Sequence, residues 1–339
     1  MSNFKGKTIL ITGGTGSFGN QLLHNIAKKD CKEIRIFSRD ELKQELMRKE
    51  FDYPNVRFYI GDVRDRSSVD NAMIGVDLVF HAAALKQVPS CEFFPMQAVL
   101  TNVIGGSNVI ESAIMNKVNS IVCLSTDKAV YPINVMGMTK SLMEKYARAA
   151  ARNLDENDTL VSCVRYGNVM YSRGSVIPLF INQIKQNKPI TITDPRMTRF
   201  LLHLDDAIDL VLFALENARQ GDIFIKKAPA CTVIDLVSAL QRIFKSDLPI
   251  KTIGIRHGEK IYETLATMEE LSMSEDMGDY FRCAMDNRNL NYDKYSIEGD
   301  LREATLEDYT SHNTYKLNAQ EVEALILTLP EVVSELSAL

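Results

Sequence analysis

A glycine-rich segment near the N-terminus constrains the fold of this chain more than any other feature. The segment ITGGTGSFGNQLL spaces Gly14, Gly16 and Gly19 as G-x-G-x-x-G, and it also reads as Gly13-x-x-Gly16-x-x-Gly19. An apolar run precedes these glycines and an amphipathic run follows them. Glycines at these positions allow a tight turn and let the backbone approach a pyrophosphate, whose charge the following helix N-terminus stabilises. The segment therefore predicts a dinucleotide-binding strand, turn and helix.

Short apolar runs alternate with longer segments of helical period through the first half of the chain. We expect strands at 8–12, 33–38, 56–62, 77–84, 120–126 and 160–168, and helices at 18–29, 95–117 and 137–153. This alternation predicts an α/β fold with a Rossmann-like, doubly wound parallel sheet of six or more strands.

The second half of the chain has shorter and less regular elements. We expect helices at 175–186, 204–218, 232–244 and 319–337, strands at 222–227 and 250–255, and a polar flap, interface arm or loop at 267–300. The predicted organisation is an NADP-binding Rossmann domain over 1–168, a smaller α/β substrate-binding lobe over 169–300 and a C-terminal tail with a helix over 301–339. Some later segments could return to the first domain.

Composition excludes several classes of function. The net charge of -5 comes without a clustered basic face, which argues against nucleic acid as a partner. The six cysteines form no C-x-x-C pair, so we expect reduced structural thiols. No His, Cys and Asp set has metal-ligand spacing. No run approaches the ~20 apolar residues of a membrane span. We therefore expect a cytoplasmic protein with no membrane partner.

The end of the second predicted strand bears on the choice of cofactor. An acidic residue there favours NAD, whereas an arginine accommodates the 2′-phosphate of NADP. The chain has Ser38, Arg39 and Asp40, with Lys43 one turn later. Ser38 and Arg39 favour NADP, and Asp40 keeps NAD open. Asp62, after the third strand, could bond the adenine amine or serve as a helix N-cap.

Six motifs together carry a family resemblance. The segments TGGTGSFG, GDVRD, HAAALKQVP, LSTDKAVYPIN, GMTK and RYGNVMYSRGSVIPLF resemble the extended short-chain dehydrogenase/reductase superfamily. More narrowly, they are similar to the bacterial UDP-N-acetylglucosamine 4,6-dehydratases that invert C5 in capsule and O-antigen synthesis. The resemblance covers the chain to about residue 300. The cofactor-binding residues that we expect are Gly13, Thr15, Gly16, Ser17, Phe18, Gly19, Ser38, Arg39, Asp62, Val63, Ala82, Ala83, Ala84 and Lys140.

The helix that would carry the catalytic tyrosine departs from the superfamily pattern. There, a tyrosine and a lysine in Y-x-x-x-K share a helix face, and the ammonium lowers the phenol pKa so that the phenolate can remove a hydroxyl proton. Lys140 keeps the place of the lysine, but Met136 replaces the tyrosine. A thioether cannot carry a proton. The protons must therefore move by another route, or the protein is a catalytically silent NADP- and UDP-sugar-binding sensor.

The resemblance supplies an acid and a base on the loop after the fifth strand. In this chain those positions are Asp127 and Lys128, with Thr126 beside them. Lys128 as the C5 base would need a lowered pKa, which burial beside Lys140 could provide, and Asp127 as the acid would need a raised one. For the first proton, from the C4 hydroxyl, the candidates are Lys140, Asp127 or a relayed water, with Tyr131 weaker.

The resemblance also implies substrate contacts. Asn168 would meet the diphosphate, Arg199 and Arg256 would clamp it, Glu259 would accept from a ribose hydroxyl and Lys86 would lie near the sugar phosphate. The function we expect is NADP-dependent 4,6-dehydration of UDP-N-acetylglucosamine with C5 inversion, the first step towards UDP-N-acetyl-L-fucosamine. A C5-retaining dehydratase and a C4 epimerase are alternatives. A homo-oligomer, a hexamer with a contribution from 267–300, is implied as well.

Overall fold

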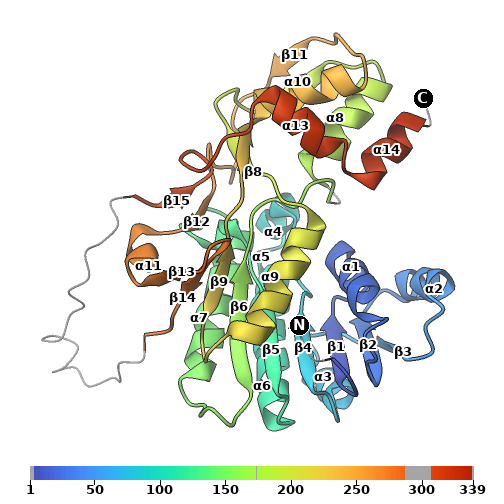
Figure 1. Cartoon of the computed structure of the whole chain (residues 1–339), viewed down its shortest axis with the longest axis vertical. Coiled ribbons are helices and arrows are strands. Elements are labelled where there is room, and N and C mark those ends of the chain that lie inside the picture. The colour runs from blue at the N-terminus through green and yellow to red at the C-terminus, as the bar shows by residue number, and fades with distance from the viewer. Residues whose placement is uncertain (1–3, 173, 287–306, 338–339) are drawn as a thin grey trace, which may run out of the picture.

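One large, mostly parallel sheet organises the molecule. The computed structural model describes residues 4–172, 174–286 and 307–337. Within them the sheet has the order β13-β14-β9-β6-β5-β4-β1-β2-β3 (Figure 1). The strands are β1 Thr8–Thr12, β2 Glu33–Ser38, β3 Val56–Ile60, β4 Leu78–His81, β5 Ser120–Leu124, β6 Leu160–Arg165, β9 Ile223–Lys226, β13 Ser274–Asp276 and β14 Tyr280–Cys283. The strands from β3 to β9 are parallel, which confirms the predicted fold class.

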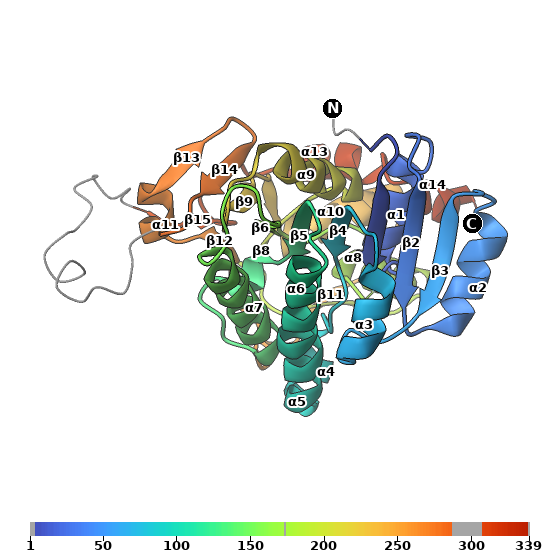
Figure 2. The ribbon, with the colours of Figure 1, turned by 90° about the horizontal axis from the view of Figure 1, so that it is seen from below.

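Helices cover both faces of this sheet, which buries alternate strand residues in two separate cores. One core contains Leu10 and side chains of α6 and α7, and the other contains Ile9, Ile11 and side chains of α1 and α9. In Figure 2, α3, α6 and α7 lie on one side of the strands and α9 on the other. The bounds are α1 Ser17–Ile26, α2 Glu41–Glu50, α3 Arg66–Met73, α6 Gly105–Met115, α7 Val135–Ala151 and α9 Leu204–Asn217.

The predicted helix at 95–117 is present as a continuous run of three pieces. It consists of α5 Pro95–Ala98, the π-helical turn η1 Val99–Ile104, and α6. By length and composition alone, the run Pro95–Met115 could cross a membrane, unlike our expectation. Half of its most apolar window is buried, and α6 packs between α3 and α7. The packing is that of a core helix.

The smaller lobe lies beyond one end of the sheet (Figure 1). Its helices α8, α10 and α13 enclose a third core with Phe180, Val237 and Ile326. The helices are α8 Val176–Lys185, α10 Val233–Ile243 and α13 Ala319–Ile326, and the strands are β7 Ile190–Ile192, β8 Thr198–Phe200, β10 Ala230–Thr232, β11 Ile250–Thr252, β12 Thr264–Ala266 and β15 Tyr309–Thr310.

Several segments after residue 168 return to the main sheet. The strand expected at 222–227 is β9, which pairs with β6, and α9 covers the same region. Residues 267–286 of the polar segment include α11 Met268–Ser272 and the antiparallel strands β13 and β14. The rest of that segment, and the expected boundary at 300, lie outside the described residues.

The single helix expected at 319–337 is two helices. α13 ends at Ile326, and α14 spans Pro330–Ser337. Proline has no N–H and clashes with the preceding helical turn, so Pro330 can begin a helix but cannot continue one. The apolar residues of 319–337 keep a helical period across the break, so the sequence pattern predicted a single helix.

Candidate active site

The glycine-rich turn has the geometry of a dinucleotide cradle. Gly13 has a φ of +64°, and a Cβ there would lie 2.7 Å from the backbone nitrogen of Ala83. A Cβ on Gly19 would lie 2.2 Å from the carbonyl oxygen of Gly14, so this glycine lets α1 approach the turn. Gly16 precedes α1, and its position offers no side-chain cap to the first helical turn. Free N–H groups at a helix N-terminus are suited to bind a phosphate.

A cavity of about 510 Å³ opens beside this turn. It lies where β1, β2, β3 and β4 end, which is where open α/β sheets bind nucleotides. Eight of the predicted cofactor residues line it: Gly13, Thr15, Ser38, Arg39, Asp62, Val63, Ala83 and Ala84. The others stand apart from the lining: Gly16, Ser17, Phe18 and Gly19 continue the turn into α1, Ala82 precedes Ala83, and Lys140 lies on α7.

Cationic and acidic side chains lie together at the part of the cavity expected to hold the ribose of a bound dinucleotide. Arg39 is half exposed and lies 3.4 Å from the carboxylate of Asp62, and Lys43 lies 2.7 Å from Asp40. The side chain of Asp40 also caps α2, accepting from the backbone of Lys43. Thr15 and Ser38 share a hydroxyl hydrogen bond of 2.8 Å. These groups fit a ribose that carries either a hydroxyl or a phosphate.

Asp62 is not the N-cap of a helix, because Asp65 caps α3. The carboxylate of Asp62 instead accepts hydrogen bonds from the backbone and side chain of Arg64. Partial burial raises the pKa of Asp62, but the hydrogen bonds from Arg64 and the charge of Arg39 outweigh it and hold the pKa below its usual value. Asp62 is therefore an anionic acceptor at the cavity.

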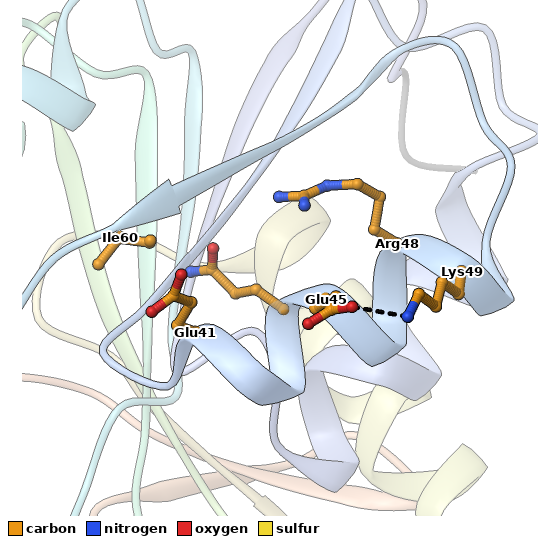
Figure 3. Close-up of a pocket in the computed structure, with 6 residues that line it drawn as sticks. Glu41, Glu45, Arg48, Lys49 and Ile60 are labelled. Carbon is orange, nitrogen blue, oxygen red and sulfur yellow. Dashed lines mark hydrogen bonds and ion pairs between the residues drawn. The ribbon is translucent and has the colours of Figure 1, made fainter.

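A second hollow is lined by α2 and by the end of β3 (Figure 3). Its lining is Glu41, Gln44, Glu45, Arg48, Lys49 and Ile60. Glu45 and Lys49 pair across one helical turn at 2.6 Å, as solvated surface residues do. This hollow brings together none of the predicted site residues.

The acid and base predicted after the fifth strand lie in a short, buried turn, η2 Asp127–Ala129. Asp127 is fully buried, and its Oδ1 accepts from Thr126 Oγ1 at 2.8 Å and from Lys128 Nζ at 3.0 Å. Its Oδ2 is buried and has no hydrogen-bond partner among the described residues. An ion pair removed from water with an unsatisfied oxygen is costly unless the site uses it.

A third ionisable group, Glu263, completes this cluster and was not predicted from the sequence. Its Oε1 lies 3.5 Å from Lys128 Nζ. Burial lowers the pKa of Lys128, but the carboxylates of Asp127 and Glu263 outweigh burial and raise it. The expectation that Lys128 has a lowered pKa beside Lys140 is therefore wrong. The two carboxylates near the amine decide the direction of the pKa shift of Lys128. The sequence does not reveal that Glu263 is a neighbour.

Lys140 is buried on α7 and faces the end of β5. Its Nζ donates to the carbonyl oxygen of Leu124 at 2.8 Å. Burial lowers the pKa of Lys140. Nearby His81 is fully buried, and burial together with the charge of Lys140 lowers its pKa to about 3. Lys140 thus has the lowered pKa that the sequence assigned to Lys128.

The lysine helix and the acid–base turn touch through Gly137. A Cβ at Gly137 would lie 2.1 Å from the carbonyl oxygen of Lys128. Asn134 caps α7 by accepting from Gly137 N–H at 2.8 Å, which fixes the helix start. The glycine in the GMTK motif is therefore what lets the two halves of the site meet.

We expect Gly137→Ala to disturb the site through this contact. The new methyl group would displace the backbone of Lys128, with a cost of about 1–3 kcal/mol in the free energy of unfolding. Turnover should fall more than stability alone explains, because the acid–base turn moves. Thermal melting and initial rates check this, with Met138→Ala on the exposed side of the same helix as the control. Equal effects of the two variants would contradict it.

Met136, in the position of the missing tyrosine, is a packing residue. It is 4% exposed and lies in a small apolar cluster with Cys91 and Ala98. Tyr131 does not replace it, because its hydroxyl lies 3.4 Å from Asp308 at an exposed position. The predicted candidates for proton transfer in this region therefore stay Asp127, Lys128 and Lys140.

Met136→Leu should accordingly keep a rate close to that of the wild type, because leucine preserves the apolar volume. Met136→Tyr should lower stability by about 1–3 kcal/mol through overpacking and give no large gain in rate. Denaturant unfolding and initial rates measure both effects. A large gain with tyrosine would show that methionine is a tolerated loss.

The predicted substrate residues lie in two groups. Arg199 joins the acid–base cluster, with its Nε 3.7 Å from Glu263 and its guanidinium donating to the carbonyl oxygen of Lys260. Arg256 and Glu259 form the other group, with Arg256 Nε 3.5 Å from the Glu259 carboxylate. Two further predicted residues, Asn168 and Lys86, form no hydrogen bond or ion pair with either group within the described ranges. Asn168 Oδ1 is buried and has no hydrogen-bond partner there, and Lys86 is exposed.

Comparison with known protein families identifies the family of this chain. Residues 9–285 match the family model described as polysaccharide biosynthesis protein, and residues 286–333 match the model of its C-terminal part. The chain belongs to the polysaccharide biosynthesis protein family. Members of this family that share the fold described above are nucleotide-sugar-modifying enzymes of the extended short-chain dehydrogenase/reductase superfamily.

Relatives of this polysaccharide biosynthesis protein span its whole length. Proteins named UDP-glucose 4-epimerase from Rickettsia canadensis (strain McKiel) and Rickettsia bellii (strain RML369-C) are both 60% identical, over 98% of this chain and 99% of theirs. The X-ray structure of Pen from Bacillus thuringiensis is 39% identical, covers 97% of this chain and 100% of its own, and has a TM-score of 0.88.

A more distant structure shares the fold of this polysaccharide biosynthesis protein. It is described as DesIV, a dTDP-glucose 4,6-dehydratase from Streptomyces venezuelae with NAD and TYD bound. It is 23% identical, covers 75% of this chain and 86% of its own, and has a TM-score of 0.68.

Proposed function

We propose that this chain is an NADP-dependent UDP-N-acetylglucosamine 4,6-dehydratase that inverts C5, with a product that leads towards UDP-N-acetyl-L-fucosamine. The observation that carries the proposal is the ion pair between the fully buried Asp127 and the partly buried Lys128 at the carboxyl end of β5. A C4 epimerase needs only to move a hydride and a hydroxyl proton at C4. Removal of water across C5 and C6 needs an additional base and an additional acid, which this pair supplies.

The pair can reach the required protonation states by one proton shift. Lys128 Nζ lies 3.0 Å from Asp127 Oδ1, so an N–H bond can break as an O–H bond forms. The neutral amine then takes the C5 proton, and the carboxylic acid gives its proton to the leaving C6 hydroxyl, which departs as water. Both groups regain their starting charge. When bound, the nicotinamide would accept a hydride from C4, and the resulting ketone would acidify C5. The hydride would return to C6 while C5 takes a proton from water on the opposite face, which inverts C5.

For the first proton, we propose Lys140 as the group that receives it from the C4 hydroxyl. Burial lowers the pKa of Lys140, which favours its neutral amine. Asp127, directly or through a water, is the alternative. Met136 only packs beside them.

The cofactor proposal rests on the cations at the cavity. Arg39 and Lys43 line it, and either can pair with a 2′-phosphate. The names of distant structures favour NAD instead, since DesIV and a UDP-glucuronic acid 4-epimerase from Bacillus cereus are described with NAD. Asp40 keeps NAD open here, and a direct comparison of the two cofactors decides between them.

Arg199, Arg256, Glu259, Asn168 and Lys86 are proposed to bind the UDP-sugar. We also propose a cytoplasmic site of action and a homo-oligomer, a hexamer, as the working form. The second candidate function is 4-epimerisation of a UDP-sugar, which the names of the Rickettsia relatives favour.

One experiment separates these functions. The purified chain is incubated in deuterium oxide with UDP-N-acetylglucosamine, or with UDP-glucose, and with NADP or NAD, and the sugar is followed by proton NMR. A new C6 methyl group with deuterium at C5 supports the dehydratase. An inverted C4 without loss of water supports the epimerase, and an unchanged sugar under all conditions points to a silent sensor.

A further inference from the structure

Glu263 occupies a fixed position at the acid–base turn although it comes from a distant part of the chain. It directly precedes β12 and is 3% exposed. Its backbone N–H donates to Ser311 Oγ at 2.9 Å, and its carbonyl oxygen accepts from Ser311 N–H at 2.9 Å. These two bonds hold the residue against the turn.

The carboxylate of Glu263 is incompletely satisfied. Its Oε1 lies 3.5 Å from Lys128 Nζ and 3.7 Å from Arg199 Nε. Its Oε2 is buried, and no group in the described part of the chain forms a hydrogen bond with it. A purely structural buried carboxylate is normally fully bonded, as Glu144 is with Arg165 at 2.8 and 2.6 Å. The Glu263 carboxylate can therefore accept a further hydrogen bond next to the proposed base.

We propose that Glu263 is a positioning residue that acts through Lys128 and sets the pH up to which Lys128 holds the proton that it shares with Asp127. The inference rests on the proposed dehydratase function and adds a carboxylate that no motif assigned. It gives the two carboxylates at Lys128 different tasks. Asp127 exchanges a proton with the amine, whereas Glu263 biases the amine by its charge.

The charges that face Lys128 define the direction of this effect. They are the anions Asp127 and Glu263 and the cations Arg199 and Lys260. Burial favours the neutral amine of Lys128, and the two carboxylates together overcome burial and raise its pKa. Without the charge of Glu263, one anion would face two cations and burial. The neutral amine should then form at lower pH.

The test is the pH dependence of C5 deuterium incorporation in wild type and in Glu263→Gln. Incorporation accompanies loss of water, which needs the proton that Lys128 and Asp127 share, so the rate falls as pH rises above the pKa of Lys128 and the pair loses that proton. In Glu263→Gln this alkaline limb should move to lower pH by about 1 unit, which is the size expected for the loss of one close opposite charge. Glu263→Asp, which keeps the charge, should remain near the wild-type limb.

A merely structural role would lower the maximal rate or the stability and leave the limb in place, and that result, or a limb at higher pH, overturns the proposal. Glu144→Gln is the matched control, because it removes a buried carboxylate that pairs with Arg165 away from Lys128. It should destabilise the protein without moving the limb.

A readout without substrate separates this proposal from the proposed function. Acetic anhydride labels an amine only in its neutral form, and mass spectrometry gives the labelling rate of Lys128 at each pH. The labelling midpoint should be about 1 unit lower in Glu263→Gln. Unchanged labelling overturns the role of Glu263. If wild type shows no C5 chemistry but the midpoint moves, the dehydratase function fails while the charge relation at Lys128 stands.

Discussion

Replacing Lys128 with methionine is expected to stop loss of water from the sugar while oxidation at C4 continues. Methionine retains the length of the side chain but cannot take the C5 proton, and loss of a general base typically lowers a rate by about 10²–10⁴-fold. The reduced nicotinamide should therefore accumulate with the substrate. Its absorbance and the absence of a new C6 methyl signal in the proton NMR spectrum measure the two halves of the result.

The control for this variant is Lys145→Met, at an exposed position of α7. It should leave the rate unchanged. Thermal melting of Lys128→Met is needed as well, because Asp127 and Glu263 would lose their shared cation and leave two buried carboxylates side by side. Dehydration at the wild-type rate in a folded Lys128→Met protein would contradict the assigned role.

Lys140→Met is expected to block the reaction earlier. If Lys140 receives the proton of the C4 hydroxyl, its loss should lower C4 oxidation by about 10²–10⁴-fold. Neither reduced cofactor nor C5 deuterium should then appear. Lys128→Met should therefore reduce the cofactor whereas Lys140→Met should not. Both variants should fail to release water from the sugar.

Asp127→Asn distinguishes the two candidates for the first proton. If Lys140 takes it, Asp127→Asn should still reduce the cofactor and fail only at loss of water. If Asp127 takes it, Asp127→Asn should show no reduction and Lys140→Met should retain it. Tighter or weaker cofactor binding by Lys140→Met is measured separately by titration, so that a binding defect is not read as a chemical one.

Local pattern was sufficient to predict the nucleotide-binding half of the fold. Buried strands read as continuous apolar runs, and the strands β1 and β2 begin and end where the runs TILIT and EIRIFS do. The glycine turn was also predictable, because its backbone geometry admits few other residues. Eight expected cofactor residues line one cavity because the carboxyl ends of parallel strands lie at one edge of the sheet.

What the sequence could not show depends on contacts between distant segments. β9 has the same apolar pattern whether it pairs with β6 or lies in the lobe, so its place in the sheet was open. Glu263 approaches Lys128 only because β12 packs near the η2 turn. The direction of the Lys128 pKa follows from that approach. A residue before a short lobe strand carries no local signal of such a neighbour.

The return of β9 to the sheet has a consequence for how the chain is made. As the protein leaves the ribosome, β6 is an unpaired sheet edge until the whole stretch to β9 has emerged, and β9 in turn waits for β14. Open parallel edges with distant partners form slowly and are prone to wrong pairing. Truncation of the nascent chain before Ile223 should therefore give an aggregation-prone fragment, although the complete nucleotide turn is already present.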